Sequence, residues 1–171
     1  MRIYEGTPRQ DFEEVFRAIG AVLDQRGYRE ILLTEVPDGF LVQGLRAEGS
    51  SSGWGDSMGR VEKETLTFSD DEIARYMDEA LARRGHGTPA VDRGTRAYER
   101  ALRVIGRYLD EQQPRDVFFF EQEGAFVVRL LVSDQGPRHM LAEFTREDID
   151  ELVRQGPARR HASPRDALLA D

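Results

Sequence analysis

The 171-residue chain contains no cysteine, no asparagine, a single lysine and a single tryptophan. Without cysteine, disulfides, thiolate-bound metal ions and a cysteine nucleophile are excluded. No apolar run approaches the roughly 18 residues that indicate a membrane-spanning helix, and the first residues lack the apolar segment of a secretion signal. We therefore expect a cytoplasmic protein that does not associate with membranes.

Acidic residues outnumber basic ones, and the formal net charge is -8. Nonspecific binding to nucleic acid or to an anionic membrane needs a cationic surface, so we expect neither partner. Arginine supplies 23 of the 24 basic residues. Because lysine and asparagine codons are AT-rich, this bias indicates a GC-rich bacterial genome.

One stretch of the chain occurs twice. Residues 12–44 return without a gap as residues 98–130, shifted by 86 positions. The identical pairs are Glu13/Glu99, Arg17/Arg103, Ile19/Ile105, Gly20/Gly106, Leu23/Leu109, Asp24/Asp110, Arg29/Arg115, Glu35/Glu121, Phe40/Phe126 and Val42/Val128. The repeat predicts an internal duplication whose two halves pair about a pseudo-two-fold axis.

Apolar residues recur every three or four positions in four segments, which predicts four amphipathic helices. The first helix is expected to end at Gly27, because glycine favours the position after a helix. The spacing of Ser69–Glu72 and of Thr145–Asp148 is that of a capping box, so the second and fourth helices should begin there. A mid-helix glycine costs about 1 kcal/mol relative to alanine, so matched Gly20 and Gly106 indicate two backbones in close contact.

Between these helices, apolar and β-branched runs bounded by turn residues predict six strands. Their expected bounds are Arg29–Val36, Phe40–Ala47, Val61–Phe68, Asp116–Gln122, Ala125–Ser133 and His139–Phe144. Each half then has the order αβββα, with repeats at residues 1–86 and 95–157, a linker at 87–94 and a polar tail at 158–171. We expect one compact α+β domain with an antiparallel sheet of six strands and helices on one face. The tail is expected to be disordered or to form a short docked helix.

The strands of the second repeat are apolar on both faces, as the run Phe118, Phe119 and Phe120 illustrates. A strand that is apolar on both faces is usually covered on both, and the helices cover only one. We therefore expect a homodimer through the sheet face of the second repeat, or another protein partner. The αβββα order also resembles that of small bacterial secretion-chaperone-like folds, which are acidic and dimeric and bind other polypeptides. That resemblance lies in the order of the elements alone.

The segment Glu48–Gly59 has the composition of a loop and contains the single tryptophan, Trp54. Ser51, Ser52 and Asp56 lie close to it in the sequence. A tryptophan on a polar loop is typical of a binding hot spot. An equally good interpretation is that Trp54 folds back over the sheet as an apolar plug.

Two glutamates in otherwise apolar strands, Glu35 and Glu121, follow the matched arginines Arg29 and Arg115. One interpretation is a pair of carboxylates with shifted pKa values that performs acid–base chemistry between the halves. The favoured interpretation is a structural Glu–Arg pair, or a solvent-facing strand residue, that occurs twice because the half was duplicated.

Asp24 and Asp110 lie near the ends of the first and third helices, where a carboxylate opposes the helix dipole. We therefore expect each of them to have an arginine partner, either Arg17 and Arg103 or Arg29 and Arg115.

The sequence contains no recognisable catalytic motif, and its three histidines lack the spacing of metal ligands. We therefore predict no catalytic residue, no metal and no cofactor. The preferred hypothesis is a non-catalytic protein-interaction or chaperone-like binding module. The alternative is a small-molecule-binding protein or enzyme with a pocket between the two repeats.

Overall fold

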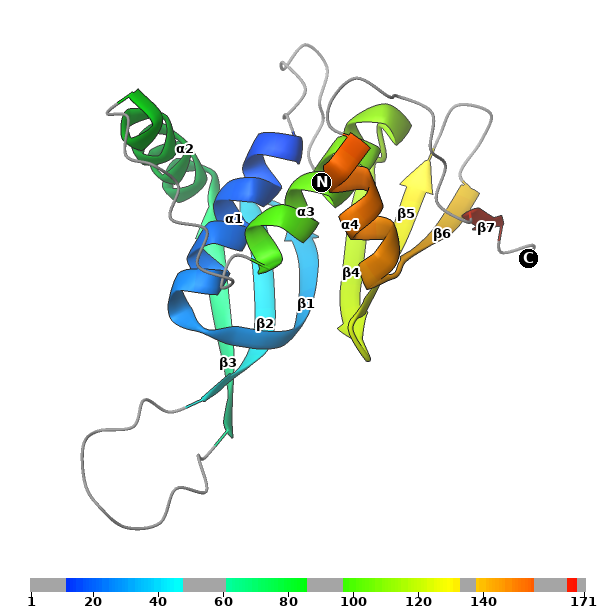
Figure 1. Cartoon of the computed structure of the whole chain (residues 1–171), viewed down its shortest axis with the longest axis horizontal. Helices are drawn as coiled ribbons and strands as arrows, with labels where there is room; N and C mark the ends of the chain where they lie inside the picture. The colour runs from blue at the N-terminus through cyan, green and yellow to red at the C-terminus, as the bar shows by residue number, and fades with distance from the viewer. Residues whose placement is uncertain (1–11, 48–60, 86–96, 133–137, 156–165, 169–171) are drawn as a thin grey trace.

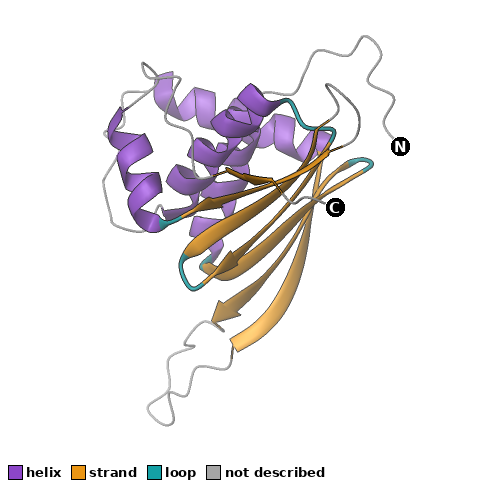
Figure 2. Cartoon of the chain, turned by 90° about the vertical axis from the view of Figure 1, so that its right-hand side faces the viewer, coloured by secondary structure: helices purple, strands orange, loops and turns teal. Residues whose placement is uncertain are grey.

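The computed structural model describes residues 12–47, 61–85, 97–132, 138–155 and 166–168. Within these ranges, four helices pack on one face of a single antiparallel sheet (Figures 1 and 2). The predicted α+β class with helices on one face is therefore confirmed. No helix in these ranges is long and apolar enough to cross a membrane. The linker at 87–94 and the loop with Trp54 lie outside the described residues.

The four helices are α1 (Phe12–Arg26), α2 (Asp70–Gly85), α3 (Ala97–Gln112) and α4 (Arg146–Gln155). Both predicted capping boxes are present. The backbone N–H of Ser69 donates to the Glu72 carboxylate at 3.0 Å, and the N–H of Glu72 donates to the Ser69 hydroxyl at 3.3 Å. Thr145 and Asp148 exchange the same two bonds at the start of α4. These exchanges satisfy N–H groups that the first turn of a helix leaves unpaired.

The six predicted strands form within one residue of their expected bounds. They are β1 (Tyr28–Val36), β2 (Gly39–Ala47), β3 (Val61–Ser69), β4 (Asp116–Gln122), β5 (Ala125–Val132) and β6 (Arg138–Phe144). A seventh short strand, β7 (Asp166–Leu168), pairs with β6 and completes the order β3-β2-β1-β4-β5-β6-β7. At these three residues the tail is a strand, and the predicted choice between disorder and a short helix was wrong.

The pairing of β1 with β4 joins the two halves of the sheet. Leu33 lies opposite Phe119 at the centre of this antiparallel ladder. Both side chains are completely buried between the sheet and the helices, together with Phe16, Phe40 and Phe144. The core therefore runs without interruption from one half of the chain to the other.

Helices α1 and α3 lie next to each other over the centre of the sheet (Figure 1). A Cβ atom added to Gly20 would lie 2.6 Å from the carbonyl oxygen of Tyr98, at the start of α3. A Cβ atom added to Gly106 would lie 2.3 Å from the carbonyl oxygen of Phe12, at the start of α1. The predicted backbone contact at both glycines is confirmed, and the two helices run antiparallel.

Replacing Gly20 or Gly106 with alanine should destabilise the chain, although the same change in a free helix stabilises it by about 1 kcal/mol. The added methyl group meets backbone, which must shift, so we expect a loss of about 1–3 kcal/mol in the free energy of unfolding. Urea unfolding measures this, with Glu111→Ala at an exposed position of α3 as the control. A gain in stability for Gly106→Ala would contradict the close contact.

Candidate functional site

The N-terminus of each central helix is capped by a carboxylate from the other helix. Asp110 of α3 accepts hydrogen bonds from the backbone N–H groups of Phe12 at 2.8 Å and Glu13 at 3.0 Å. Asp24 of α1 accepts hydrogen bonds from the backbone N–H groups of Tyr98 at 3.0 Å and Glu99 at 2.9 Å. A carboxylate beside a helix N-terminus satisfies unpaired donors and favours the positive end of the dipole. The sequence predicted arginine side chains as partners of the two aspartates and did not predict these backbone donors.

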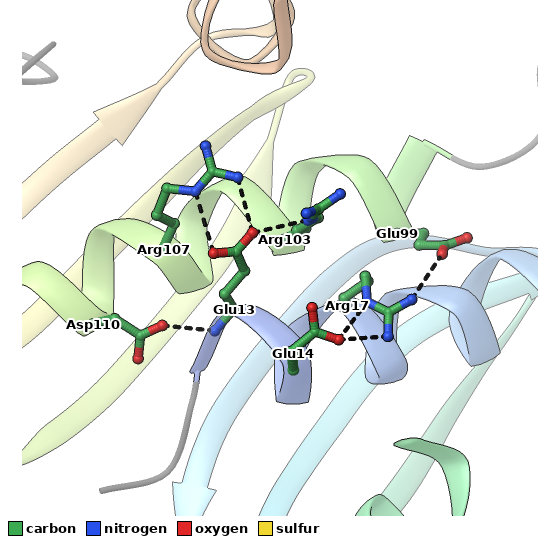
Figure 3. A network of polar contacts seen from close by, with 7 residues as sticks. All are labelled: Glu13, Glu14, Arg17, Glu99, Arg103, Arg107 and Asp110. Atoms are coloured by element: carbon green, nitrogen blue, oxygen red, sulfur yellow. Dashed lines mark hydrogen bonds and ion pairs between the residues drawn. The ribbon is translucent and has the colours of Figure 1, made fainter. Parts of the chain in front are cut away.

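The same two helices exchange ion pairs along their contact (Figure 3). Arg103 of α3 donates through Nε to the Glu13 carboxylate of α1 at 2.9 Å. Arg17 of α1 lies 3.8 Å from the Glu99 carboxylate of α3. Two of the arginines predicted as partners of the aspartates, Arg17 and Arg103, therefore contact glutamates of the opposite helix. Arg17 is 5 % exposed, and a charge so deeply buried is tolerated only when it is paired.

Each ion pair has one additional charged neighbour. Arg107 donates a second hydrogen bond to Glu13 at 2.8 Å, and Arg17 donates to Glu14 at 2.5 Å. The hydrogen bond from Arg107 is the largest of the effects that lower the pKa of the Glu13 carboxyl, and Arg103 adds to it. Glu13 is therefore ionised at neutral pH and forms the negative centre of this cluster (Figure 3).

These contacts follow one stripe of each helix. In α1 the stripe is Glu13, Arg17, Gly20 and Asp24, and in α3 it is Glu99, Arg103, Gly106 and Asp110. Their spacing of four, three and four residues places them on one helix face. All four matched pairs belong to the ten identical pairs of the repeat, so this spacing was the sequence signal for an interhelical contact.

Glu121 lies on β4 and connects this strand to α3 and β1, where the two halves of the sheet meet. Its carboxylate accepts a hydrogen bond from the hydroxyl of Tyr98 on α3 at 2.5 Å and a long one from the N–H of Ile31 at 3.4 Å. Ile31 lies where β1 shifts register, next to Glu30, whose φ of 49° is unusual for a residue other than glycine. Burial, followed by the hydrogen bond to Glu121, raises the pKa of the Tyr98 hydroxyl well above its ordinary value.

The structure does not bring Glu35 close to Glu121. Leu33 pairs with Phe119, so the two glutamates lie two residues from that pair in opposite directions. Four residues of strand correspond to about 13 Å, which is too far for two carboxylates to share a proton. Arg29 is exposed near the start of β1, and Arg115 is exposed just before β4. The other predicted binding residues, Trp54, Ser51, Ser52 and Asp56, lie outside the described residues.

The second candidate surface is the sheet face opposite the helices (Figure 2). Successive side chains of a strand point to opposite faces of the sheet. On either side of one fully buried row, which points toward the helices, there is therefore a row of cross-strand neighbours that points away from them. We call these two rows the open rows: Gln43–Leu32–Phe120–Val127–Glu143 and Leu41–Thr34–Phe118–Arg129–Leu141. Their apolar members remain partly exposed. The rings of Phe118 and Phe120 lie 6.1 Å apart at the centre.

The described residues contain no group of three or more histidines or acidic residues arranged to hold a metal ion. His86 and His161 lie outside the described ranges. The chemically distinctive features that remain are the polar contact between α1 and α3 and the open rows. The first is partly buried, holds the two central helices together and stabilises the fold, whereas the side chains of the open rows are exposed or partly exposed among the described residues.

Replacing either capping aspartate with alanine should destabilise the chain by about 1 kcal/mol, within the usual range for the loss of a helix cap. Asp24→Asn and Asp110→Asn keep an oxygen acceptor and should cost less. Urea unfolding at neutral pH measures both effects, with Asp78→Ala at an exposed position of α2 as the control. Equal effects of Asp110→Ala and Asp78→Ala would show that the cap contributes nothing.

Tyr98 should be among the last tyrosines to ionise as the pH rises. Because its folded pKa lies above the unfolded value of about 10, its contribution to stability is complete below that pH and is lost at higher pH. Tyr98→Phe should therefore remove a late step from the alkaline absorbance titration and make stability fall less steeply above about pH 10. Glu121→Gln should move that step to lower pH, because it removes a negative charge. If the late step of the absorbance titration is unchanged in Tyr98→Phe, that step does not belong to Tyr98.

Comparisons with models of protein families, with curated proteins and with solved structures give no match to this chain. Its function is therefore inferred from its own residues and contacts.

Proposed function

We propose that the chain is a non-catalytic protein-binding module that uses the open rows of its sheet. The observation that supports this most directly is the position of Phe118 and Phe120. Both rings lie at the centre of the face that no described helix covers, and both are partly exposed. Aromatic side chains grouped on an accessible face are typical of protein-interaction sites.

The shape of this surface fits a polypeptide better than a small molecule. The rows extend across five neighbouring strands, from β2 to β6, and their side chains alternate with a buried row. A small-molecule site is usually concave and encloses most of its ligand. An extended apolar sheet face instead provides a broad contact area, which suits the surface of another polypeptide. Capture of apolar segments of other chains would be a chaperone-like activity.

The alternative predicted from the sequence, an enzyme or small-molecule site between the repeats, has less support. At the two glycines the backbones of α1 and α3 approach each other directly, which leaves no space for a ligand there. The distance between Glu35 and Glu121 also separates the carboxylates that such a site would use. The cytoplasmic location and the bacterial source stay predictions from composition.

We also infer that the chain is an internal duplication with pseudo-two-fold symmetry. Residues 86 positions apart make reciprocal contacts, which supports the inference: Asp24 caps α3 as Asp110 caps α1. Leu33 also pairs with its own counterpart, Phe119, as a symmetry axis between β1 and β4 requires.

Binding of an unfolded polypeptide tests the proposed function. Reduced, carboxymethylated α-lactalbumin remains unfolded, and its binding to the full chain can be followed by fluorescence anisotropy. We expect binding by the wild-type chain and at least about a 10-fold weaker affinity for Phe120→Glu, since aromatic hot spots often contribute this much. The charged side chain would have to be buried without a partner.

Ala74→Glu on the exposed surface of α2 is the matched control, because it introduces the same residue on the helix side of the molecule. Circular dichroism should show that both variants remain folded. Two results would reject the open rows as a polypeptide-binding surface. One is that the wild-type chain does not bind the probe, and the other is that Phe120→Glu binds it as tightly as Ala74→Glu does.

A further inference from the structure

We infer that a second copy of this chain covers the open rows when no other polypeptide is bound, in a two-fold symmetric dimer. The inference rests on the proposed function, because it concerns the same surface and predicts that self-association and polypeptide binding compete. Three properties support it: the charge of the open rows, the arrangement of that charge, and the area of the sheet face on which the rows lie.

The open rows are neutral although the chain is strongly acidic. They contain one positive residue, Arg129, and one negative residue, Glu143, whereas the formal charge of the chain is -8. Two copies of an acidic protein repel each other over most of their surface. The open rows are a surface on which that repulsion is weak, and their apolar side chains favour contact with a similar surface.

The two charges are arranged so that the surface complements itself. Arg129 on β5 and Glu143 on β6 are exposed diagonal neighbours, and neither forms an ion pair within the described residues. Diagonal neighbours on adjacent strands lie about 7–8 Å apart. A two-fold axis that runs parallel to the sheet and passes between them places Arg129 against the partner's Glu143. The same operation places Glu143 against the partner's Arg129, as a symmetric interface requires.

The area of the face is sufficient for a stable dimer. The open rows lie at the centre of a larger sheet face. Six strands at about 4.8 Å spacing and seven residues at about 3.3 Å rise give that whole face about 29 Å by 23 Å, or about 670 Å². A standard interface buries about 800 Å² on each partner, which is similar. Face-to-face packing of two sheets is a common way to bury such a surface.

Sedimentation equilibrium of the full chain, combined with charge reversal, tests the dimer. We expect the wild-type chain to be dimeric at micromolar concentration. Arg129→Glu and Glu143→Arg should each raise the dissociation constant of the dimer at least about 10-fold, because each places like charges opposite each other twice. The double variant Arg129→Glu/Glu143→Arg restores opposite charges and should return the constant to within about threefold of wild type.

Circular dichroism and urea unfolding of each variant show whether its monomer is folded. A wild-type chain that is monomeric at every concentration overturns the dimer, and so does a dimer that is insensitive to both single reversals. If that monomer still binds unfolded α-lactalbumin, the proposed function stands without the dimer. If the dimer is weakened by the single charge reversals but the chain never binds the probe, the inferred dimer stands and the proposed polypeptide binding is rejected.

Discussion

The reciprocal capping of α1 and α3 is the contact on which the rest of the structure depends. A carboxylate near the C-terminal end of a helix is unfavourable in isolation, because it lies at the negative end of the dipole. Asp24 and Asp110 avoid this cost since the antiparallel neighbour presents its N-terminal N–H groups at the same place. The contact requires the helices to touch, and Gly20 and Gly106 make that possible because they carry no Cβ atom. The position of one helix along the other is thus set by hydrogen bonds as well as by packing.

This helix pair also determines which surface remains accessible. With α1 and α3 side by side over the centre of the sheet, β1 and β4 pair beneath them, and Leu33 and Phe119 are buried. Side chains alternate along a strand, so the residues on either side of this buried row point away from the helices. The open rows are therefore a direct consequence of the arrangement that builds the core.

Matched positions in the two halves are not equivalent everywhere. Glu13 has an additional cation in Arg107, where the other helix has Ala21, and Arg17 has an additional anion in Glu14. The hydroxyl of Tyr98 donates to Glu121, whereas the matched aromatic residue, Phe12, has no hydroxyl group. The register shift near Glu30 belongs to β1, and β4 pairs with β5 in regular register. Such differences give the halves separate local chemistry within a shared framework.

The sequence by itself determined the elements of the fold, because each has a local physical cause. Apolar periodicity, the capping residues Ser69 and Thr145, and turn residues between strands act within a few positions of the chain. The matched glycines also predicted the backbone contact. A glycine inside a helix lowers helix stability, and its occurrence at the same position in both halves indicates that two backbones pack closely there. The class of the fold and the packing of the helices on one face of the sheet followed from these signals.

Only the tertiary structure decided which distant groups meet. The partners of Asp24 and Asp110 are backbone N–H groups more than 70 positions away, and no local pattern distinguishes them from arginine side chains. The separation of Glu35 from Glu121 depends on the register of β1 against β4, which the sequence of either strand alone does not contain. The pairing of β7 with β6 likewise depends on an unpaired strand edge that exists only after the sheet has formed. Nonlocal contacts of this kind depend on the position of one element relative to another, and that position is a property of the folded chain.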